Sequence, residues 1–75
     1  MIRLSQRWTA ELIKKPEAGM GYQIATVILC DGTHYERVII DSGYITRIKD
    51  IEGIPFTESD IQDIVVTNDK WDFRS

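Results

Sequence analysis

Cys30 and His34 are the two residues whose types could support nucleophilic catalysis. The chain has one cysteine and one histidine, and they lie close together in the sequence. A thiol is activated when a base lies within hydrogen-bonding reach. In the hairpin predicted below, Cys30 lies opposite Thr33, so its side chain points to the face opposite His34. We interpret Cys30 as a small core side chain and His34 as a surface residue, and we predict a protein that is not an enzyme and has no catalytic residue.

Carboxylates form the second group that could do chemistry. Asp60 and Asp63 lie near each other, with Glu58 beside them, and paired carboxylates can bind a hard cation or transfer protons. Their spacing does not match a calcium-binding loop. A structural zinc ion needs about four ligands, which one cysteine and one histidine do not supply. We therefore predict no metal and no cofactor, and we interpret these carboxylates as a solvated surface.

A glycine-containing loop is predicted at residues 16–22. Gly19-Met20-Gly21 lacks the glycine patterns of nucleotide-binding loops, and a strand rather than a helix follows it. Met20 and Tyr22 would lie at the edge of this loop, where ligand contacts are common. One hypothesis for the function is therefore a small-ligand or enzyme-accessory domain that uses the 16–22 loop.

The composition is that of one small globular domain. The 75 residues are 43% hydrophobic and 28% charged, which is typical of folded chains, and we assign residues 1–75 to one domain with a C-terminal tail at 68–75. The start lacks an apolar signal segment, and the longest apolar run, at residues 27–30, is too short to span a bilayer. Together with the lone cysteine, this predicts a soluble cytoplasmic protein with no membrane role.

Charge is distributed unevenly along the chain. Residues 1–49 carry seven Lys and Arg against five Asp and Glu, whereas residues 50–75 carry two against seven. A solvated acidic end is one interpretation. A docking surface for a basic partner is the alternative.

Three consecutive strands are predicted in the middle of the chain. Asp31-Gly32 separates two β-branched runs and predicts a type I′ turn joining strands 22–30 and 33–41. Ser42-Gly43 predicts a second tight turn, leading into a strand at 44–51. In this register Ile28 faces Tyr35.

The same register places Ile24 opposite Ile39, Glu36 opposite Lys49 and Arg37 opposite Ile48. One sheet face then holds Ile24, Ile28, Cys30, Tyr35, Ile39 and Ile48. The other holds Ala25, Val27, Leu29, Val38, Ile40, Ile45 and Ile51. Two apolar faces predict a sheet that curls into a barrel covered by the terminal segments, or a second face that meets another chain.

The remaining elements are a helical turn, a last strand and an N-terminal segment. Thr57 and Asp60 predict a capped turn at 58–62, and residues 64–67 read as the last strand. The segment 6–14 suits a strand, but also a helix with Leu4, Trp8 and Leu12 on one face. We favour the strand because it completes a five-stranded sheet.

The predicted fold class is mainly β, a small five-stranded antiparallel barrel or roll with a short helical turn before the last strand. The alternative is an α+β fold with an N-terminal helix on a four-stranded sheet. The element order over residues 6–67 resembles that of SH3-like small β-barrels. The segment VILCDGTHYERVIID is similar to the first motif of Sm-like barrels, although the RNA-reading residues of that family are absent. The blocks PEAGMGYQ and DKWDF resemble those of short uncharacterised bacterial proteins, a likeness that implies no activity.

Aromatic residues provide the candidate partner-binding surface. The tail residues Trp71 and Phe73 either fold onto the barrel or act as anchors for a partner. With Met20, Tyr22 and Tyr44 they form the predicted partner-binding set. The leading hypothesis is a noncatalytic protein-interaction or self-association module.

Weak oligonucleotide binding is a further alternative, because Arg37, Arg47 and Lys49 lie on adjacent predicted strands near tyrosines that could stack on bases. The sequence pI of about 4.9 opposes attraction to phosphates, and Arg37 points away from the other two cations in the predicted register.

Overall fold

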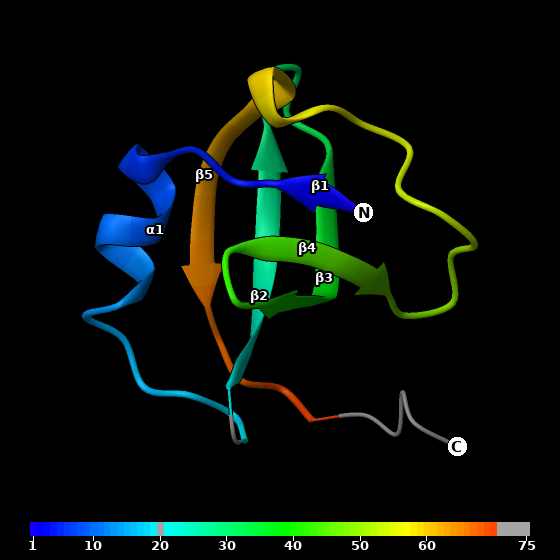
Figure 1. Ribbon diagram of the computed structural model, residues 1–75. Helices are drawn as coiled ribbons and strands as arrows, with labels where there is room; N and C mark the ends of the chain where they lie inside the picture. The colour runs from blue at the N-terminus through cyan, green and yellow to red at the C-terminus, as the bar shows by residue number, and fades with distance from the viewer. Residues whose placement is uncertain (20, 71–75) are drawn as a thin grey trace.

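The computed structural model describes residues 1–19 and 21–70 of the chain, which form one curled antiparallel sheet and a short helix (Figure 1). The elements are β1 (Ile2–Arg3), α1 (Gln6–Leu12), β2 (Tyr22–Leu29), β3 (His34–Asp41), β4 (Tyr44–Ile48), the 3-10 helix η1 (Glu58–Asp60) and β5 (Ile61–Val66). The strand order is β1-β4-β3-β2-β5. Because β1 and β5 do not pair, the sheet is a half-barrel. The predicted mainly β fold, with five antiparallel strands and a helical turn before the last one, is confirmed.

The N-terminal segment is where the sequence prediction fails most clearly. The strand expected at residues 6–14 is wrong, because α1 occupies this region and the two-residue β1 is the fifth strand. Leu4, Trp8 and Leu12 are all buried. A strand would bring Gln6 to the same face as these three side chains, whereas the helix leaves Gln6 exposed. The alternative with an N-terminal helix was right about the helix and wrong about a four-stranded sheet.

The β2–β3 connection is a hairpin loop of three residues and not the predicted type I′ turn. The Leu29 N–H donates to the Thr33 carbonyl at 2.8 Å, and the Gly32 N–H donates to the Leu29 carbonyl at 2.9 Å. Gly32 has φ 92°, but Asp31 is not left-handed, which is the pattern of a type I turn followed by a left-handed glycine. Asp31 stays in this conformation because its carboxylate accepts the Thr33 N–H at 2.9 Å.

The β3–β4 connection adopts the type I′ geometry that was predicted for the β2–β3 connection. Asp41 pairs with Tyr44, and both intervening residues are left-handed, Ser42 at φ 53° and Gly43 at φ 84°. This is the type I′ arrangement, so the second predicted hairpin is confirmed.

β2 and β3 pair in the predicted register from Tyr22 to Ala25, and the register is shifted by one residue at Val27 and Ile28. Ile24 lies opposite Ile39, as expected, but Ile28 lies opposite His34 and not Tyr35. A β-bulge in β3 causes the shift, because two β3 residues face one β2 residue there.

The bulge contains Arg37, whose φ of 54° is left-handed. A second irregularity follows between β3 and β4, so Ile48 pairs with Val38 and not with Arg37. The predicted pairing of Glu36 with Lys49 is also wrong, since the Lys49 N–H donates to the Arg37 carbonyl at 3.3 Å. Ile48 thereby moves to the core face.

The core lies on the concave face of the sheet, beneath α1. It contains most of the residues predicted for the second sheet face, together with residues of α1, of the loop between β4 and η1, and of β5. Its members are Leu4, Trp8, Leu12, Ala25, Val27, Leu29, Val38, Ile40, Ile45, Ile48, Phe56 and Ile61. Ile51 was expected on this face but is 37% exposed, because the chain has already left β4 when it reaches this residue.

η1 and the β2–β3 loop meet at one end of the half-barrel, which we call the apex. The Thr57 N–H donates to Asp60 Oδ2 at 2.9 Å, and the Asp60 N–H donates to the Thr57 carbonyl at 3.1 Å. This capping pair closes a single turn, so the helix predicted at 58–62 is shorter and β5 begins at Ile61, earlier than the predicted 64–67. The Cys30 N–H donates to the Asp60 carbonyl at 2.9 Å and joins the two loops.

Candidate functional site

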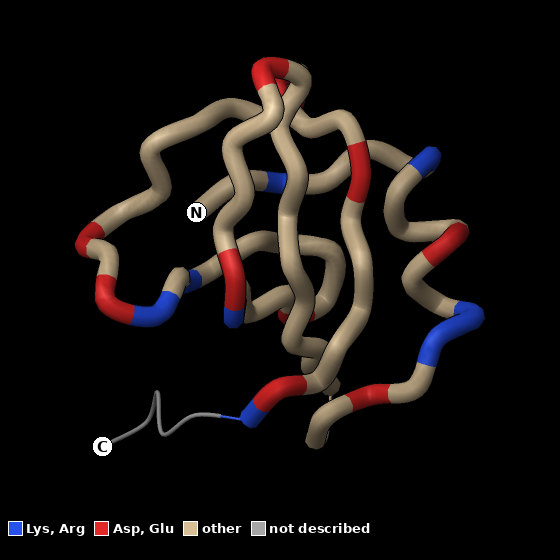
Figure 2. The backbone as a smooth tube through the Cα atoms, turned by 180° about the vertical axis from the view of Figure 1, so that it is seen from behind, with Lys and Arg blue, Asp and Glu red and all other residues tan. Residues whose placement is uncertain are grey.

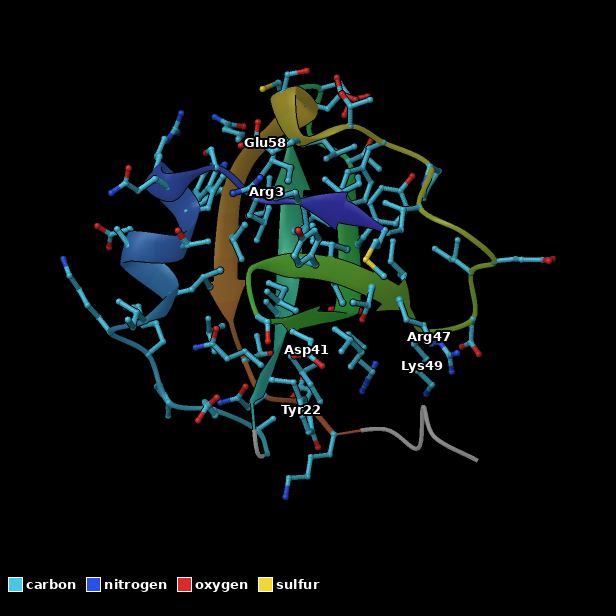
Figure 3. The ribbon with its side chains drawn as sticks, viewed as in Figure 1. Arg3, Tyr22, Asp41, Arg47, Lys49 and Glu58 are labelled. Carbon is cyan, nitrogen blue, oxygen red and sulfur yellow. The ribbon has the colours of Figure 1, made fainter. Side chains whose placement is uncertain are left out.

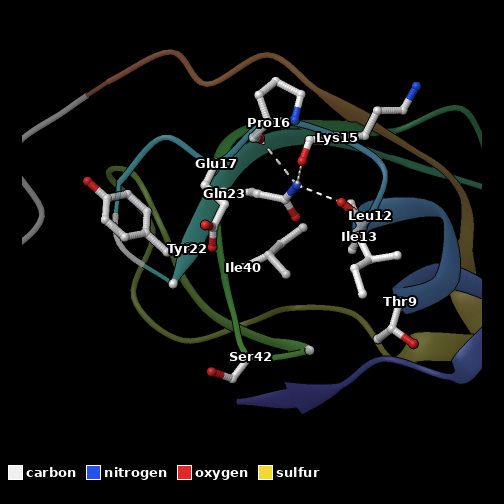
Figure 4. A pocket seen from close by; sticks show the side chains of 12 residues that line it. Thr9, Leu12, Ile13, Lys15, Pro16, Glu17, Tyr22, Gln23, Ile40 and Ser42 are labelled. Atoms are coloured by element: carbon white, nitrogen blue, oxygen red, sulfur yellow. Dashed lines mark hydrogen bonds between the residues drawn. The ribbon is translucent and has the colours of Figure 1, made fainter.

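A groove of about 680 Å³ opens at the end of the half-barrel opposite the apex (Figure 4). It lies between the C-terminal turn of α1, the loop that leads to β2, and the β3–β4 turn. The lining residues are Thr9, Leu12, Ile13, Lys15, Pro16, Glu17, Gly21, Tyr22, Gln23, Ile40, Ser42 and Gly43. Its volume falls in the range of ligand-binding pockets in proteins.

The floor of the groove is apolar and its rim is mixed. Leu12 and Ile40 are buried members of the core, whereas Ile13 is 83% exposed. Lys15 and Glu17 are exposed loop residues at the rim. A ligand in the groove would therefore meet apolar surface below and charges of both signs above.

Gln23 holds the wall of the groove in place. It is the buried polar residue of the described chain, at 8% exposure. Its Nε2 donates to the carbonyls of Leu12 at 2.8 Å, Lys15 at 3.2 Å and Pro16 at 3.3 Å. The Leu12 carbonyl also accepts the Lys15 N–H at 3.0 Å, so the Gln23 side chain adds a second donor at the end of α1 and fixes the loop that follows.

Asn68 ties the same loop to the chain beyond β5. Its Nδ2 donates to the Pro16 carbonyl at 3.0 Å, and its Oδ1 accepts the Ile24 N–H at 3.1 Å. Its own N–H donates to the Ile24 carbonyl at 2.7 Å. Asn68 has φ 54°, a conformation that asparagine tolerates better than most residues. The groove wall is thus fixed from two directions by amide side chains.

Gly19 allows the loop to pass close to the ring of Tyr22. A Cβ at Gly19 would clash with the aromatic carbons and lie 2.6 Å from the Tyr22 hydroxyl oxygen. The Ala18 N–H donates to the Tyr22 carbonyl at 3.0 Å. Tyr22 pairs with Asp41 across the β2–β3 ladder, and Figure 3 shows both at the groove end.

The predicted partner-binding residues do not form one cluster among the described residues. Tyr22 lines the groove. Tyr44 lines a neighbouring hollow of about 410 Å³, on the other side of the β3–β4 turn. Met20, Trp71 and Phe73 lie outside the described residues.

Sequence reasoning missed Gln23, Ile13 and Asn68. A signal for Gln23 was available, because positions 23, 25, 27 and 29 alternate onto one strand face and the other three are apolar. A polar side chain at the start of such a row needs a buried partner. No local pattern marks Asn68, whose contacts lie far away in the sequence.

The residues considered for nucleophilic catalysis and for metal binding lie in the described part of the chain. Cys30 is exposed, so its interpretation as a core side chain is wrong, because it belongs to the three-residue loop and not to a strand. His34 is exposed, as predicted. Within residues 1–19 and 21–70, no three His, Cys, Asp or Glu side chains come together in a way that could hold a metal ion.

Carboxylates gather at the apex, where Asp31 and Asp60 lie on the adjoining loops (Figure 2). The Thr33 backbone N–H, and next its hydroxyl, hold the pKa of the Asp31 carboxyl below its usual value. Lys14 and Lys15 lie near the groove instead, and Lys14 forms an exposed ion pair with Glu11 at 3.7 Å. The apex is therefore acidic, whereas the groove end carries charges of both signs.

Arg37 and Lys49 are closer than the predicted register allowed. Both line a shallow hollow of about 310 Å³, but Glu36 and Asp50 line it too. The local charge is therefore mixed.

No protein-family model matches the chain, and no curated protein and no solved structure is significantly similar to it. None of the described helices has the length and apolar character that crossing a membrane requires.

Proposed function

We propose that this chain is a noncatalytic binding domain whose groove takes up a segment of a protein partner. The observation that carries the proposal is the combination of a buried apolar floor, formed by Leu12 and Ile40, with the 83% exposed Ile13 at the rim. A small molecule inside the groove would contact Ile13, which lines it, but would leave the outer part of this side chain in water. A polypeptide crossing the rim would cover it and gain the free energy of burying that side chain.

The chemistry of the lining supports a noncatalytic role. Ser42 is a potential nucleophile in the lining, and its Oγ donates to Asp41 Oδ1 at 3.0 Å. A serine nucleophile is usually activated by a histidine within hydrogen-bonding reach. His34 is at the other end of β3, eight residues away along the strand, which corresponds to roughly 25 Å.

The two edges of the sheet are poorly suited to pairing with a strand of another protein, and this supports the groove as the contact surface. The first residues of β4 pair with β1, and the Ile51 N–H donates to the Ile48 carbonyl at 3.3 Å beside the end of β4. On β5, the Ile64 N–H donates to the Asp63 carboxylate at 2.8 Å. Short strands, folded-back loops and charged side chains at an edge all disfavour the addition of another strand.

Selection from a random peptide library on the immobilised chain would test this function. We expect the enriched peptides to bind the wild type and to bind Ile13→Glu at least about tenfold more weakly, because the new charge would be desolvated. Val65→Glu is the matched control, since Val65 is also an exposed apolar residue, at 45% exposure, and lies outside the groove lining. Equal binding to wild type and Ile13→Glu, or no enrichment at all, would overturn the proposal.

A small-ligand domain is the second candidate function, because Pro16, Glu17, Gly21 and Tyr22 of the 16–22 loop all contribute to the groove lining. A metabolite screen by amide NMR distinguishes it. Saturable shifts of the Gly21 and Gly43 amides with one metabolite class would support this candidate, and a silent screen would count against it. Oligonucleotide binding ranks below both, because of the mixed charge around Arg37 and Lys49.

A further inference from the structure

Gln23 presents one unused hydrogen-bonding atom at the groove. Its two N–H groups are shared among the carbonyls of Leu12, Lys15 and Pro16. Carbonyl oxygens accept and do not donate, so the nitrogen must face them and the amide oxygen must face the other way. In Figure 4 the dashed bonds leave the nitrogen toward the loop, and the oxygen points toward Ile40.

The Gln23 oxygen is an open acceptor in apolar surroundings. No hydrogen bond within the described part of the chain reaches Oε1, although the residue as a whole is 8% exposed. Among the described residues, no fully buried side-chain nitrogen or oxygen lacks a partner, so this oxygen must touch solvent. The groove, with Leu12 and Ile40 at its floor, is the open space beside it.

We propose that the groove binds a tryptophan side chain of the protein partner, with the indole N–H donating to Gln23 Oε1. The inference rests on the proposed function. An indole is a large apolar ring with one donor and no acceptor, and the floor of the groove offers apolar surface with one unused acceptor. An aliphatic side chain would cover the oxygen without replacing its hydrogen bond to water, which weakens binding.

A tyrosine matches the groove less well than a tryptophan. A phenol oxygen donates and also accepts. Two hydroxyls in the groove lining already donate elsewhere, Thr9 to the Gln6 carbonyl at 3.3 Å and Ser42 to Asp41 at 3.0 Å. The indole leaves no such acceptor to be satisfied.

Two tryptophan derivatives test the inference directly. N-acetyl-L-tryptophanamide and its 1-methylindole counterpart differ in the ring N–H and in one methyl group. Each is titrated into the ¹⁵N-labelled full chain carrying Trp71→Phe, so that Trp71 cannot compete, while the amides of Gly21 and Gly43 and the Gln23 side-chain amide are followed by NMR. We expect the parent compound to shift these signals and to bind about tenfold or more tightly than the methylated one.

Equal affinity of the two compounds, or shifts confined to signals outside the groove, would overturn the inference. Gln23→Met supplies a second measurement, because it removes the acceptor while keeping the length of the side chain. We expect it to bind both compounds alike. If this variant does not fold, the comparison of the two compounds on intact Gln23 still decides the question.

Different experimental outcomes would overturn the indole inference and the proposed protein-binding function. If library peptides bind in an Ile13-dependent way but neither compound moves the groove signals, the indole inference is overturned and the protein-binding function stands. If the two compounds are discriminated while no peptide binds, the acceptor is confirmed but the protein partner is not, and the inference as stated is overturned.

Discussion

The groove end and the apex of the half-barrel are both held by side chains that bond to the backbone, but over very different sequence distances. At the apex, Asp31 bonds two residues away and Asp60 three residues away, and both are exposed. At the groove end, Gln23 bonds 11 residues away and Asn68 bonds 52 residues away. The side-chain bonds of the apex thus stabilise local turns, whereas those of the groove wall depend on the folded arrangement of distant segments.

This difference predicts how each end responds to mutation. A hydrogen bond lost in water is replaced by a bond to solvent, whereas one lost in the interior leaves a group unsatisfied. The Gln23–Leu12 bond is buried and the Asn68–Ile24 bond is half-buried, whereas the Asn68–Pro16 bond is exposed like the bonds of the apex. Substitutions at the groove end, and at Gln23 above all, should therefore cost more stability than substitutions at the apex. Four measurements test that order.

The largest effect is expected from Gln23→Ala. The variant removes the three hydrogen bonds of the Gln23 side chain, while the Lys15 N–H and Asn68 Nδ2 still donate to the Leu12 and Pro16 carbonyls. At about 1 kcal/mol for each bond, we expect a loss of about 3 kcal/mol in the free energy of unfolding. Urea denaturation followed by circular dichroism measures it. Gln62→Ala, at an exposed glutamine of β5, should change stability by less than about 0.5 kcal/mol. A similar cost for the two variants would remove the distinction between the ends.

Asn68 should show a smaller effect with two separable parts. Asn68→Gly loses both side-chain bonds but suits the left-handed backbone, so we expect a cost of about 1 kcal/mol. Asn68→Ala loses the same bonds and adds the strain of a left-handed alanine, for a total of about 2 kcal/mol. The same denaturation experiment separates them. If Asn68→Gly is as stable as the wild type, the bonds to Ile24 and Pro16 do not stabilise the fold.

Truncating the capping acid of η1 to alanine should cost less than the same truncation of either amide. Asp60→Ala removes the acceptor for the Thr57 N–H, and losing a capping interaction costs about 1 kcal/mol. Asp60→Asn keeps an oxygen at this position and should recover part of the loss. Glu52→Ala removes an exposed acid outside the capping pair and serves as the charge control. A cost equal to that of Gln23→Ala would contradict the ranking.

Asp31 should give the smallest effect, and one that depends on pH. Because its pKa is lowered in the folded state, its contribution is complete above the unfolded pKa and is lost as pH falls through the folded value. We expect the difference in urea midpoint between the wild type and Asp31→Ala to be constant near neutral pH and to shrink below about pH 4. A difference that grows on acidification would reverse the sign and refute the assignment.

The same contrast explains what the sequence could predict. Asp31-Gly32, Ser42-Gly43 and Thr57 with Asp60 are local patterns, and the chain turns at each of them. The turn type predicted at Asp31 was wrong because a type I′ turn needs a left-handed Asp31. The hydrogen bond from the Thr33 N–H to the Asp31 carboxylate stabilises the other conformation. The bulge at Arg37 has no such local marker, so the register beyond it was shifted by one residue.

Local sequence patterns do not indicate the groove. Tyr22 was identified because it lies beside a glycine-containing loop. Gln23, its neighbour, contacts the end of α1, and this segment was expected to be a strand with no helical carbonyls to satisfy. With the helix in place, a buried glutamine facing its C-terminus has a clear physical role, and the groove follows from it.

The exposed thiol of Cys30 has a practical consequence for any binding assay. It is the single cysteine of the chain and lies at the apex, while Tyr22 and Gln23 at the other end of the eight-residue β2 line the groove. The separation is roughly 25 Å along the strand. A maleimide dye or a biotin tether attached there would leave the groove unobstructed, giving site-specific labelling or oriented immobilisation without mutation. The same thiol can cross-link two copies on oxidation, so measurements of self-association require a reductant or an alkylated sample.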